Sequence, residues 1–494
     1  MARAVCALAL WAGVGSLGAA PAGAQPYLSY PVGAGPVSIA AGDLNRDGRP
    51  DLVTANNSSN SVSVLLNRGA GRFDRVSDLA ASGASCVAIA DLNGDGVPDL
   101  VVTGNGVSVF RGYGDGTFGS GVGYSDSLYF SCAAVGDVNW DGRPDVVAGE
   151  FVNEVAVFPG HGDGTLGAPM YFDANPRDAT ATVSRPVAGS STPPQPMKVI
   201  MISGVAIGDL DGGGWPDIAV SLDDPYSEFA HQVLLGNGDG TFRQATPIYD
   251  PGYSRSIAMA DCNRDAWPDL AVANGGYQAI AVVLDPGNGA GGSASNLPTR
   301  STPLGIAAGD LNRDGATDLV SSNYPGEVCV WLSNGAGGFG APVYFATSEV
   351  PNAITIADLD GDGRADLATT DQNASTVSLL FGDGSGGFGG SPTVAVPQAA
   401  RPGVLALERV HPNPARARAT VRFTLPRAGR ATLRVLDTAG RLVATLEDRF
   451  LPAGEHVAAW DGRGFDGATA APGVYVCELR FEGRALSRTL AVIK

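Results

Sequence analysis

The chain has 494 residues and a formal net charge of −18 at pH 7, with 69 Gly and 33 Pro. This length exceeds what one ordinary hydrophobic core accommodates, so we expect two or three domains. The acidic balance argues against a nucleic-acid partner, because phosphate binding requires basic surface. Many short apolar runs separated by Gly, Asn and Asp favour an all-β fold.

The first 24 residues have the features of a signal peptide. Arg3 supplies a positive charge, residues 5–17 form an apolar stretch, and Ala22-Gly23-Ala24 offer a small-residue cleavage site. The apolar stretch is too short and too rich in Gly to anchor the chain in a membrane. We expect cleavage after Ala24, no transmembrane segment in the mature chain, and a secreted or outer-membrane cell-surface location.

A nine-residue acidic pattern then occurs seven times, and we call its copies loops 1 to 7, with positions 1 to 9. The copies are DLNRDGRPD, DLNGDGVPD, DVNWDGRPD, DLDGGGWPD, DCNRDAWPD, DLNRDGATD and DLDGDGRAD, starting at Asp43, Asp91, Asp137, Asp209, Asp261, Asp310 and Asp358. Their spacing of 46 to 52 residues, with one exception of 72, indicates a repeat architecture.

Each repeat has the same order of short segments. In the first repeat an apolar strand at residues 37–41 leads into the acidic loop, two strands follow, and a Gly-rich turn ending at Phe73 precedes a fourth strand. Four strands at this period form a propeller blade. We therefore predict an all-β fold with a seven-bladed β-propeller over residues 25–390.

A propeller must close, because an open ring leaves sheet edges exposed. Residues 27–32 read as an outer strand that lies before the first complete repeat. We expect this segment to complete the last blade, although residues 393–396 could compete for that edge. Residues 391–403 are then a linker.

The acidic loops carry oxygen ligands at regular positions. Side-chain oxygens at positions 1, 3 and 5 converge when the chain turns sharply, Gly at position 6 permits the turn, and position 7 can add a backbone carbonyl. Asp at position 9 can close a compact site. Hard oxygen ligands without His or Cys favour Ca²⁺ over zinc or copper. The alternative is that Asp, Asn and Gly serve only as turn residues.

The predicted calcium ligands come from all seven loops. They are Asp43, Asn45, Asp47, Arg49, Asp51, Asp91, Asn93, Asp95, Val97, Asp99, Asp137, Asn139, Asp141, Arg143, Asp145, Asp209, Asp211, Asp217, Asp261, Asn263, Asp265, Asp269, Asp310, Asn312, Asp314, Ala316, Asp318, Asp358, Asp360, Asp362, Arg364 and Asp366. Gly213 replaces the acid at position 5 of loop 4, and Ala266 replaces the turn glycine of loop 5. We therefore expect about five strong and two weak sites, with dissociation constants on the order of 10⁻⁴ to 10⁻³ M.

These loops resemble those of the FG-GAP/VCBS repeat family, which includes the integrin α-subunit propeller. The resemblance covers about residues 36–390 and includes Gly-rich turns such as residues 112–118. It implies a calcium site between the first two strands of a blade, on one face of the disc. It says less about function, since the family includes adhesins, lectin-like modules and some polysaccharide lyases.

The cysteines do not form a disulfide framework. Five remain after cleavage, an odd number without metal-binding spacing: Cys86, Cys132, Cys262, Cys329 and Cys477. We interpret them as small buried strand residues. A disulfide between Cys86 and Cys132, which precede consecutive loops by the same distance, is the alternative.

Two insertions interrupt the repeats. Residues 173–200 are rich in Pro, Ser and Thr, and residues 223–231 lengthen a connection in the fourth blade. Both fall on the face opposite the acidic loops, where binding loops on a rigid scaffold often lie. Tyr226, Phe229 and His231 are therefore candidate contacts to an unknown protein or glycan ligand, with a tolerated insertion as the alternative.

The last part of the chain, residues 404–494, differs in character. It is richer in Arg, lacks acidic loops and contains about seven short alternating segments, which indicate an Ig-like sandwich. Asn413-Pro414, Trp460-Asp461-Gly462 and Pro472-Gly473-Val474-Tyr475 resemble the Ig-like domain of flagellar hook-capping proteins and the type IX secretion C-terminal sorting domain. The resemblance implies contact with secretion machinery; an ordinary structural sandwich is the alternative.

The function that these features predict is binding, adhesion or surface display. The sequence shows no Ser/His/Asp order, nucleotide loop or zinc motif. A calcium-assisted polysaccharide lyase, or another extracellular carbohydrate-active enzyme, remains the alternative. Lys198 and His231 are its nearest candidate bases.

Overall fold

The computed structural model describes most of the chain. The described residues are 27–124, 128–151, 154–174, 201–223, 231–244, 252–289, 292, 294–389, 405–407, 419–425, 429–438, 440–451, 454–460, 462–464, 469–481 and 484–493. The predicted signal peptide (1–24), the linker (391–403) and nearly all of the insertion at 173–200 lie outside them. Within these ranges the secondary structure is entirely strands and turns, so none of them contains a helix that could cross a membrane.

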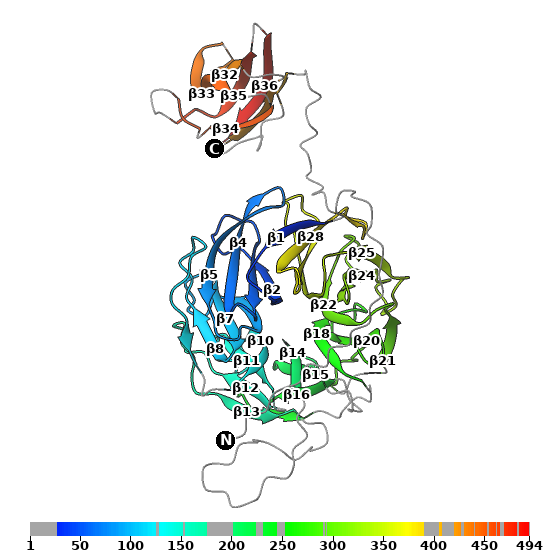
Figure 1. Cartoon of the computed structure of the whole chain (residues 1–494). Coiled ribbons are helices and arrows are strands. Elements are labelled where there is room, and N and C mark those ends of the chain that lie inside the picture. The colour runs from blue at the N-terminus through cyan, green and yellow to red at the C-terminus, as the bar shows by residue number, and fades with distance from the viewer. Residues whose placement is uncertain are drawn as a thin grey trace, which may run out of the picture. The chain divides into compact units, whose positions relative to one another are not determined.

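The chain forms two compact units, residues 1–393 and 394–494. In the first unit, the described residues form seven antiparallel sheets arranged as blades (Figure 1). Blade 1 runs from the centre outward in the order β2 (Pro36–Gly42), β3 (Asp51–Asn56), β4 (Ser61–Gly69) and β5 (Arg72–Ala80). The all-β propeller fold predicted from the sequence is confirmed.

The next five blades repeat this order. Their strands are β6 (Cys86–Ala90), β7 (Asp99–Gly104), β8 (Gly106–Phe110) and β9 (Val122–Gly123); β10 (Phe130–Gly136), β11 (Asp145–Glu150), β12 (Glu154–Phe158) and β13 (Met170–Asp173); β14 (Met201–Gly208), β15 (Asp217–Asp223), β16 (His231–Gly236) and β17 (Phe242–Gln244); β18 (Ser254–Ala260), β19 (Asp269–Asn274), β20 (Ala279–Val283) and β21 (Ala294–Pro298); and β22 (Pro303–Gly309), β23 (Asp318–Asn323), β24 (Glu327–Trp331) and β25 (Val343–Ala346).

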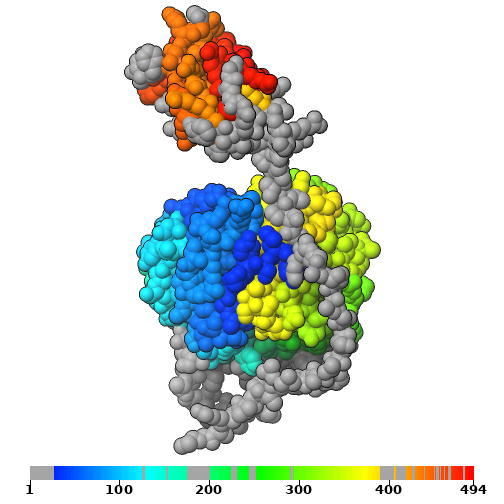
Figure 2. Space-filling view, turned by 45° about the horizontal axis from the view of Figure 1, so that its top comes forward, coloured from blue at the N-terminus to red at the C-terminus, as the bar shows by residue number. Residues whose placement is uncertain are grey.

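The two ends of the propeller meet in the last blade. This blade contains β26 (Pro351–Ala357), β27 (Asp366–Asp371), β28 (Thr376–Gly382) and the short β29 (Phe388–Gly389). Its outer strand is β1 (Leu28–Pro31), which pairs antiparallel with β28, as expected (Figure 2). The inner strands β26 and β2 then contact each other, so the ring is closed.

The hydrophobic cores lie between neighbouring blades. One core combines Val101 and Val109 of blade 2 with Val146, Ala148 and Phe158 of blade 3. Because each blade is covered on both faces, its second strand is buried without alternation, and β3, β7, β11, β19, β23 and β27 are buried along their whole length. These strands also contain polar residues, such as Thr54 and Asn56 in β3, whose side chains form hydrogen bonds within the blade. This packing fixes where the acidic loop of each blade begins and ends.

The second unit is the predicted Ig-like sandwich. One sheet has the order β30 (Ala406–Leu407), β31 (Ala419–Leu425) and β34 (Gly454–Trp460). The other has the order β33 (Leu442–Leu451), β32 (Gly429–Asp437), β35 (Gly473–Phe481) and β36 (Arg484–Val492). Phe423, Trp460 and Cys477 are buried between the sheets. The Trp460 Nε1–H donates to the Arg463 carbonyl at 2.8 Å, which satisfies its buried donor.

Candidate metal centre

Each acidic loop connects the first strand of a blade to the second. Its position 9 Asp opens the second strand and pairs with the last residue of the first, as Asp51 does with Gly42. Positions 4 and 6 have left-handed backbone; in loop 1, φ is 59° at Arg46 and 82° at Gly48. The sequence identified the turn at position 6. It missed position 4, because Arg or Trp stands there in four loops and neither residue type signals a positive φ.

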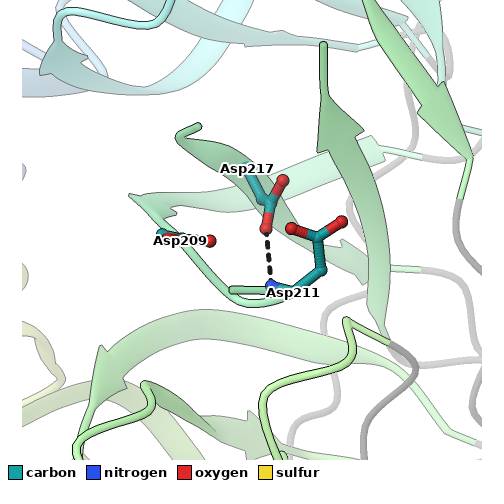
Figure 3. Close-up of side chains that lie close together, drawn as sticks. All are labelled: Asp209, Asp211 and Asp217. Carbon is teal, nitrogen blue, oxygen red and sulfur yellow. Dashed lines mark hydrogen bonds between the residues drawn. The ribbon is translucent and has the colours of Figure 1, made fainter. Parts of the chain in front are cut away.

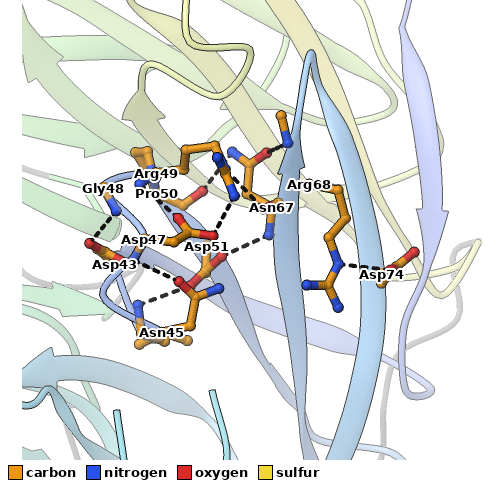
Figure 4. A network of polar contacts seen from close by, with 12 residues as sticks. Asp43, Asn45, Asp47, Gly48, Arg49, Pro50, Asp51, Asn67, Arg68 and Asp74 are labelled. Carbon is orange, nitrogen blue, oxygen red and sulfur yellow. Dashed lines mark hydrogen bonds and ion pairs between the residues drawn. The ribbon is translucent and has the colours of Figure 1, made fainter. Parts of the chain in front are cut away.

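The side-chain oxygens at positions 1 and 3 accept hydrogen bonds from the loop's own backbone. In loop 1, the Gly48 N–H donates to Asp43 Oδ2 at 2.8 Å, and the Asp47 N–H donates to Asn45 Oδ1 at 3.0 Å (Figure 4). Both bonds recur in all seven loops. The acidic residues therefore have a turn-forming role, which does not use every oxygen lone pair.

The Asp at position 9 fastens the loop to the third strand. Asp51 Oδ2 accepts the Leu44 N–H at 2.9 Å, while its Oδ1 accepts the Asn67 N–H at 2.7 Å. The same pair of bonds forms in the other six loops. All seven of these Asp residues are fully buried. Sequence reasoning did not foresee this clamp, because Asn67 lies far along the chain from Asp51 and carries no motif of its own.

Burial raises the pKa of these clamp carboxyls. Desolvation is the main cause, and it raises the pKa of Asp51, Asp217 and Asp269 to about 6 and that of Asp366 to about 7. Hydrogen bonds from backbone N–H groups lower the pKa of these carboxyls, whereas repulsion from the neighbouring loop carboxylates raises it. A nearby cation would favour the ionised form of each carboxyl.

Three carboxylates gather in two of the loops. Among the described residues, the groups that could hold a metal are Asp209, Asp211 and Asp217 in loop 4 (Figure 3) and Asp358, Asp360 and Asp366 in loop 7, each with oxygens within 4.8 Å of one another. In both loops the backbone N–H of position 3 donates to the position 9 carboxylate at 3.2 Å. This bond draws the position 3 side chain toward the cluster.

The cluster in loop 7 contains a buried oxygen without a hydrogen bond. Asp360 is 7% exposed, and its Oδ2 has no donor. Asp209 Oδ1 in loop 4 is also buried without a donor. Burial raises the pKa of Asp360 to about 6, and repulsion from Asp362 and Asp358 adds to the effect. An uncompensated buried carboxylate oxygen is costly, so this donor set fits a hard divalent cation.

The structure gathers carboxylates in a loop where the sequence predicted a weak site. Loop 4 was expected to be weak because Gly213 replaces the position 5 acid, yet it gathers three carboxylates because position 3 is Asp211. Loops 1, 2, 3, 5 and 6 have Asn at position 3, and so bring a neutral oxygen to the same place. In loop 5, Ala266 takes the turn conformation at φ 73°. At position 5 of loop 1, Asp47 pairs with Arg49 at 2.5 Å.

Of the three ligand contacts predicted on the opposite face, only His231 lies within the described residues. Tyr226 and Phe229 lie outside the described residues. His231 opens β16 and is 1% exposed, so it is a core residue rather than a surface contact. Burial lowers its pKa to about 4, which keeps the ring neutral at pH 7.

All five cysteines in the described part of the chain are free thiols. Cys132, Cys262, Cys329 and Cys477 are buried, and Cys86 is half-buried. Desolvation raises the pKa of Cys132 to about 12. Four of the cysteines lie in strands, as predicted, whereas Cys262 is buried at position 2 of loop 5. No disulfide joins Cys86 to Cys132.

The chain is similar in part to several solved structures. One is "BBS1N in complex with ARL6DN, soaked with lead" (15% identity, 75% of this chain, 98% of that chain, TM-score 0.46). A mercury-soaked crystal of the same complex gives 13% identity, 75% and 98% coverage and a TM-score of 0.49. The third is PorZ, a surface component of the type-IX secretion system of Porphyromonas gingivalis (15% identity, 91% of this chain, 58% of that chain, TM-score 0.41).

Family comparison identifies both units. No curated protein matches the chain. Residues 413–480 match the FlgD Ig-like domain, in agreement with the predicted hook-capping resemblance. Five copies of the FG-GAP-like repeat match at residues 43–102, 91–148, 209–272, 261–321 and 310–369. Because these matches together span more than half of the chain, the protein belongs to the FG-GAP-like repeat family.

Proposed function

We propose that this protein is an exported calcium-binding propeller that acts as a binding or surface-display module. The observation that carries the proposal is the loop 7 cluster, in which Asp358, Asp360 and Asp366 converge around a buried oxygen without a donor. Repulsion among three carboxylates favours either protonation or a cation. Carboxylate oxygens without His or Cys suit Ca²⁺ better than zinc or copper.

Loops 4 and 7 are the strongest sites in this proposal, and the other five are weaker. The three-carboxylate clusters supply more negative charge than loops with Asn at position 3, and ligand charge is one determinant of calcium affinity. In loop 4 the Arg243 guanidinium lies 3.1 Å from Asp211 Oδ2, where it offsets part of the charge and would turn away when the ion binds. Loop 7 is therefore the best single site.

The residues support a binding role more than catalysis. The loop carboxylates already accept backbone N–H groups, so they help to hold the loops in place. For the lyase alternative, His231 is buried and neutral, and Lys198 lies outside the described residues. We propose that the Ig-like unit directs export or attachment at the outer membrane through secretion machinery, as its resemblance to sorting domains implies.

The test is calcium binding by the full-length mature protein. Titration calorimetry should detect at least two sites, and the double variant Asp358→Asn/Asp360→Asn should lose one of them. Asp74→Asn is the matched control, because Asp74 is an exposed carboxylate on β5 that pairs with Arg68. Unchanged calcium uptake in the double variant, or no uptake by the wild type, would overturn the proposal.

A further inference from the structure

Three exposed tryptophans lie on neighbouring acidic loops. Trp140 on loop 3, Trp215 on loop 4 and Trp267 on loop 5 are 60%, 39% and 37% exposed. The other tryptophans among the described residues, Trp331 and Trp460, are 1% and 2% exposed. Large aromatic side chains are normally buried, so exposed tryptophans confined to three consecutive blades mark an interaction surface. We call Trp140, Trp215 and Trp267 the tryptophan row.

The rings of the row are held in place by their neighbours. Trp140 and Trp215 pack edge to face, with centroids 5.1 Å apart and an interplanar angle of 79°. The Trp215 indole lies over Gly238, where a Cβ would be 2.5 Å from the ring. Trp267 lies over Gly287 in the same way, and its far edge reaches Gly212 of loop 4. This packing pre-organises the row, which lowers the entropy cost of binding.

The same positions carry arginine elsewhere in the ring. Position 7 is Arg in loops 1, 3 and 7, where it contacts the corresponding hairpin glycine or pairs with position 5. Position 4 is Arg46 in loop 1, and its guanidinium donates to the Asp95 carbonyl of loop 2 at 3.0 Å. At these positions an arginine side chain therefore makes hydrogen bonds, ion pairs or van der Waals contacts with its own or a neighbouring loop. At position 4 of loop 3 and position 7 of loops 4 and 5, tryptophan provides an uncharged, flat surface instead, while loop 3 keeps Arg143 at position 7 and loop 5 keeps Arg264 at position 4.

Polar groups border the row. Asn237 and Asn288 are exposed next to the two glycines under the rings. Asp239 is exposed as well, and its Oδ1 accepts the Thr241 hydroxyl at 2.5 Å. The border thus combines amide groups with acceptor oxygens. It also carries the exposed guanidinium groups of Arg243 and Arg264, but the carboxylates of loops 3 to 5 outnumber the arginines, so its net charge is negative. An anionic ligand would be repelled here, whereas a neutral ligand with many hydroxyl groups finds donors and acceptors on both sides.

We propose that the tryptophan row binds a neutral polysaccharide whose sugars are pyranoses with equatorial hydroxyls. Such a ring has an apolar C–H face, which packs on an indole, and a polar edge, which meets the bordering amides and carboxylates. A row across three blades suits a chain of several sugars better than a single sugar. This inference rests on the proposed binding function, for which it names the ligand class.

The area of the row favours a glycan over a protein. The three exposed indole surfaces together offer roughly 300 Å². A stable protein interface usually buries about 800 Å² on each partner. A linear oligosaccharide can be held by a few aromatic platforms, because each sugar contacts one ring.

Cellohexaose is the probe, added to the full-length mature protein in millimolar Ca²⁺. We expect a blue shift of tryptophan emission and a calorimetric binding signal, with no comparable signal from hexagalacturonate, the anionic comparator. Trp215→Ala/Trp267→Ala should weaken binding by roughly tenfold or more, since truncating an aromatic anchor usually costs more than about 1 kcal/mol. Tyr277→Ala is the matched control: Tyr277 is 56% exposed in the β19–β20 hairpin, at the opposite end of its blade.

Trp140→Ala is a second variant that should affect protein stability less, because Trp140 is the most exposed of the three tryptophans. Calcium-dependent melting of each variant verifies its fold. Loss of cellohexaose affinity in the folded Trp variants, with the Tyr277 control unchanged, supports the row as a glycan site. Equal affinity in all variants, a preference for hexagalacturonate, no binding of cellohexaose or xylohexaose, or capture of a protein on the row would overturn it. Cellohexaose binding without calcium uptake would refute the calcium proposal alone, and the reverse result would refute this inference alone.

Discussion

The acidic loops and the Ig-like unit hold their carboxylates in different ways. In the Ig-like unit carboxylates pair with arginines on exposed strands, as Asp448 does with Arg430 at 3.1 Å and Glu478 with Arg480 at 2.7 Å. In the loops the main hydrogen-bond donors are backbone N–H groups, and in loop 7 three carboxylates converge. The Ig-like unit therefore balances these carboxylates with arginines. In the loops arginine pairs with single carboxylates such as Asp47 and Asp211, while most of the hydrogen bonds come from the backbone and loops 4 and 7 concentrate three carboxylates each.

The largest expected difference between the two units is their response to calcium removal. A site with a dissociation constant of about 10⁻⁴ to 10⁻³ M gains roughly 1.4–2.7 kcal/mol in about 10 mM Ca²⁺, so loops 4 and 7 together contribute about 3–5 kcal/mol. Differential scanning calorimetry should show the propeller transition falling in chelator. The transition of the Ig-like unit should stay in place. A propeller melting temperature that is the same with and without chelator would contradict this difference between the two units.

A slightly smaller loss is expected when a clamp is removed. Asp51→Ala leaves the buried N–H groups of Leu44 and Asn67 without an acceptor, and we expect a cost of about 2–4 kcal/mol in the free energy of unfolding. Asp448→Ala, the matched change in the Ig-like unit, removes an exposed ion pair and should cost much less than Asp51→Ala. Urea denaturation of both variants in chelator measures the difference. Similar losses would show that the clamp is no more than a surface contact.

The pH response should also separate the two units. Asp371 on β27 is fully buried among hydroxyl groups, and burial raises its pKa to about 6. The folded state then binds this proton more tightly than the unfolded state, so its stabilising effect is complete below about pH 4 and is lost as the pH rises through 6. In chelator, Asp371→Asn should reduce the fall in propeller melting temperature between about pH 5 and pH 7.

The Ig-like unit supplies the control for this experiment. Its Asp448 pairs with Arg430, which holds the pKa of Asp448 below its ordinary value. That carboxyl stays ionised in both states across the same pH window, so it adds no slope there. An unchanged pH slope in the propeller of the Asp371→Asn variant would contradict the assignment.

The repeated loop made most of the fold predictable from the sequence. Its period fixed the blades, and positions 6 and 9 were singled out because Gly and Asp recur there. The clamp partners could not be predicted, since the bond from Asn67 to Asp51 depends on strand pairing within the blade. The sequence also shows Asp at position 3 of loops 4 and 7, but coordinates were needed to see that this carboxylate lies within 4.8 Å of those at positions 1 and 9.

The smallest expected effect concerns one residue of loop 5. The Ig-like unit uses glycine where its backbone turns left-handed, as at Gly440 with φ 77°, whereas loop 5 has Ala266 at φ 73°. An alanine in this conformation costs about 1–2 kcal/mol, part of which is recovered because alanine restricts the unfolded chain more than glycine. Ala266→Gly should therefore stabilise the propeller by about 1 kcal/mol in chelator, whereas Gly440→Ala should destabilise the Ig-like unit by a similar amount. Chemical denaturation of the two variants provides the comparison, and a destabilised Ala266→Gly would mean that this methyl group contributes packing that outweighs the backbone strain.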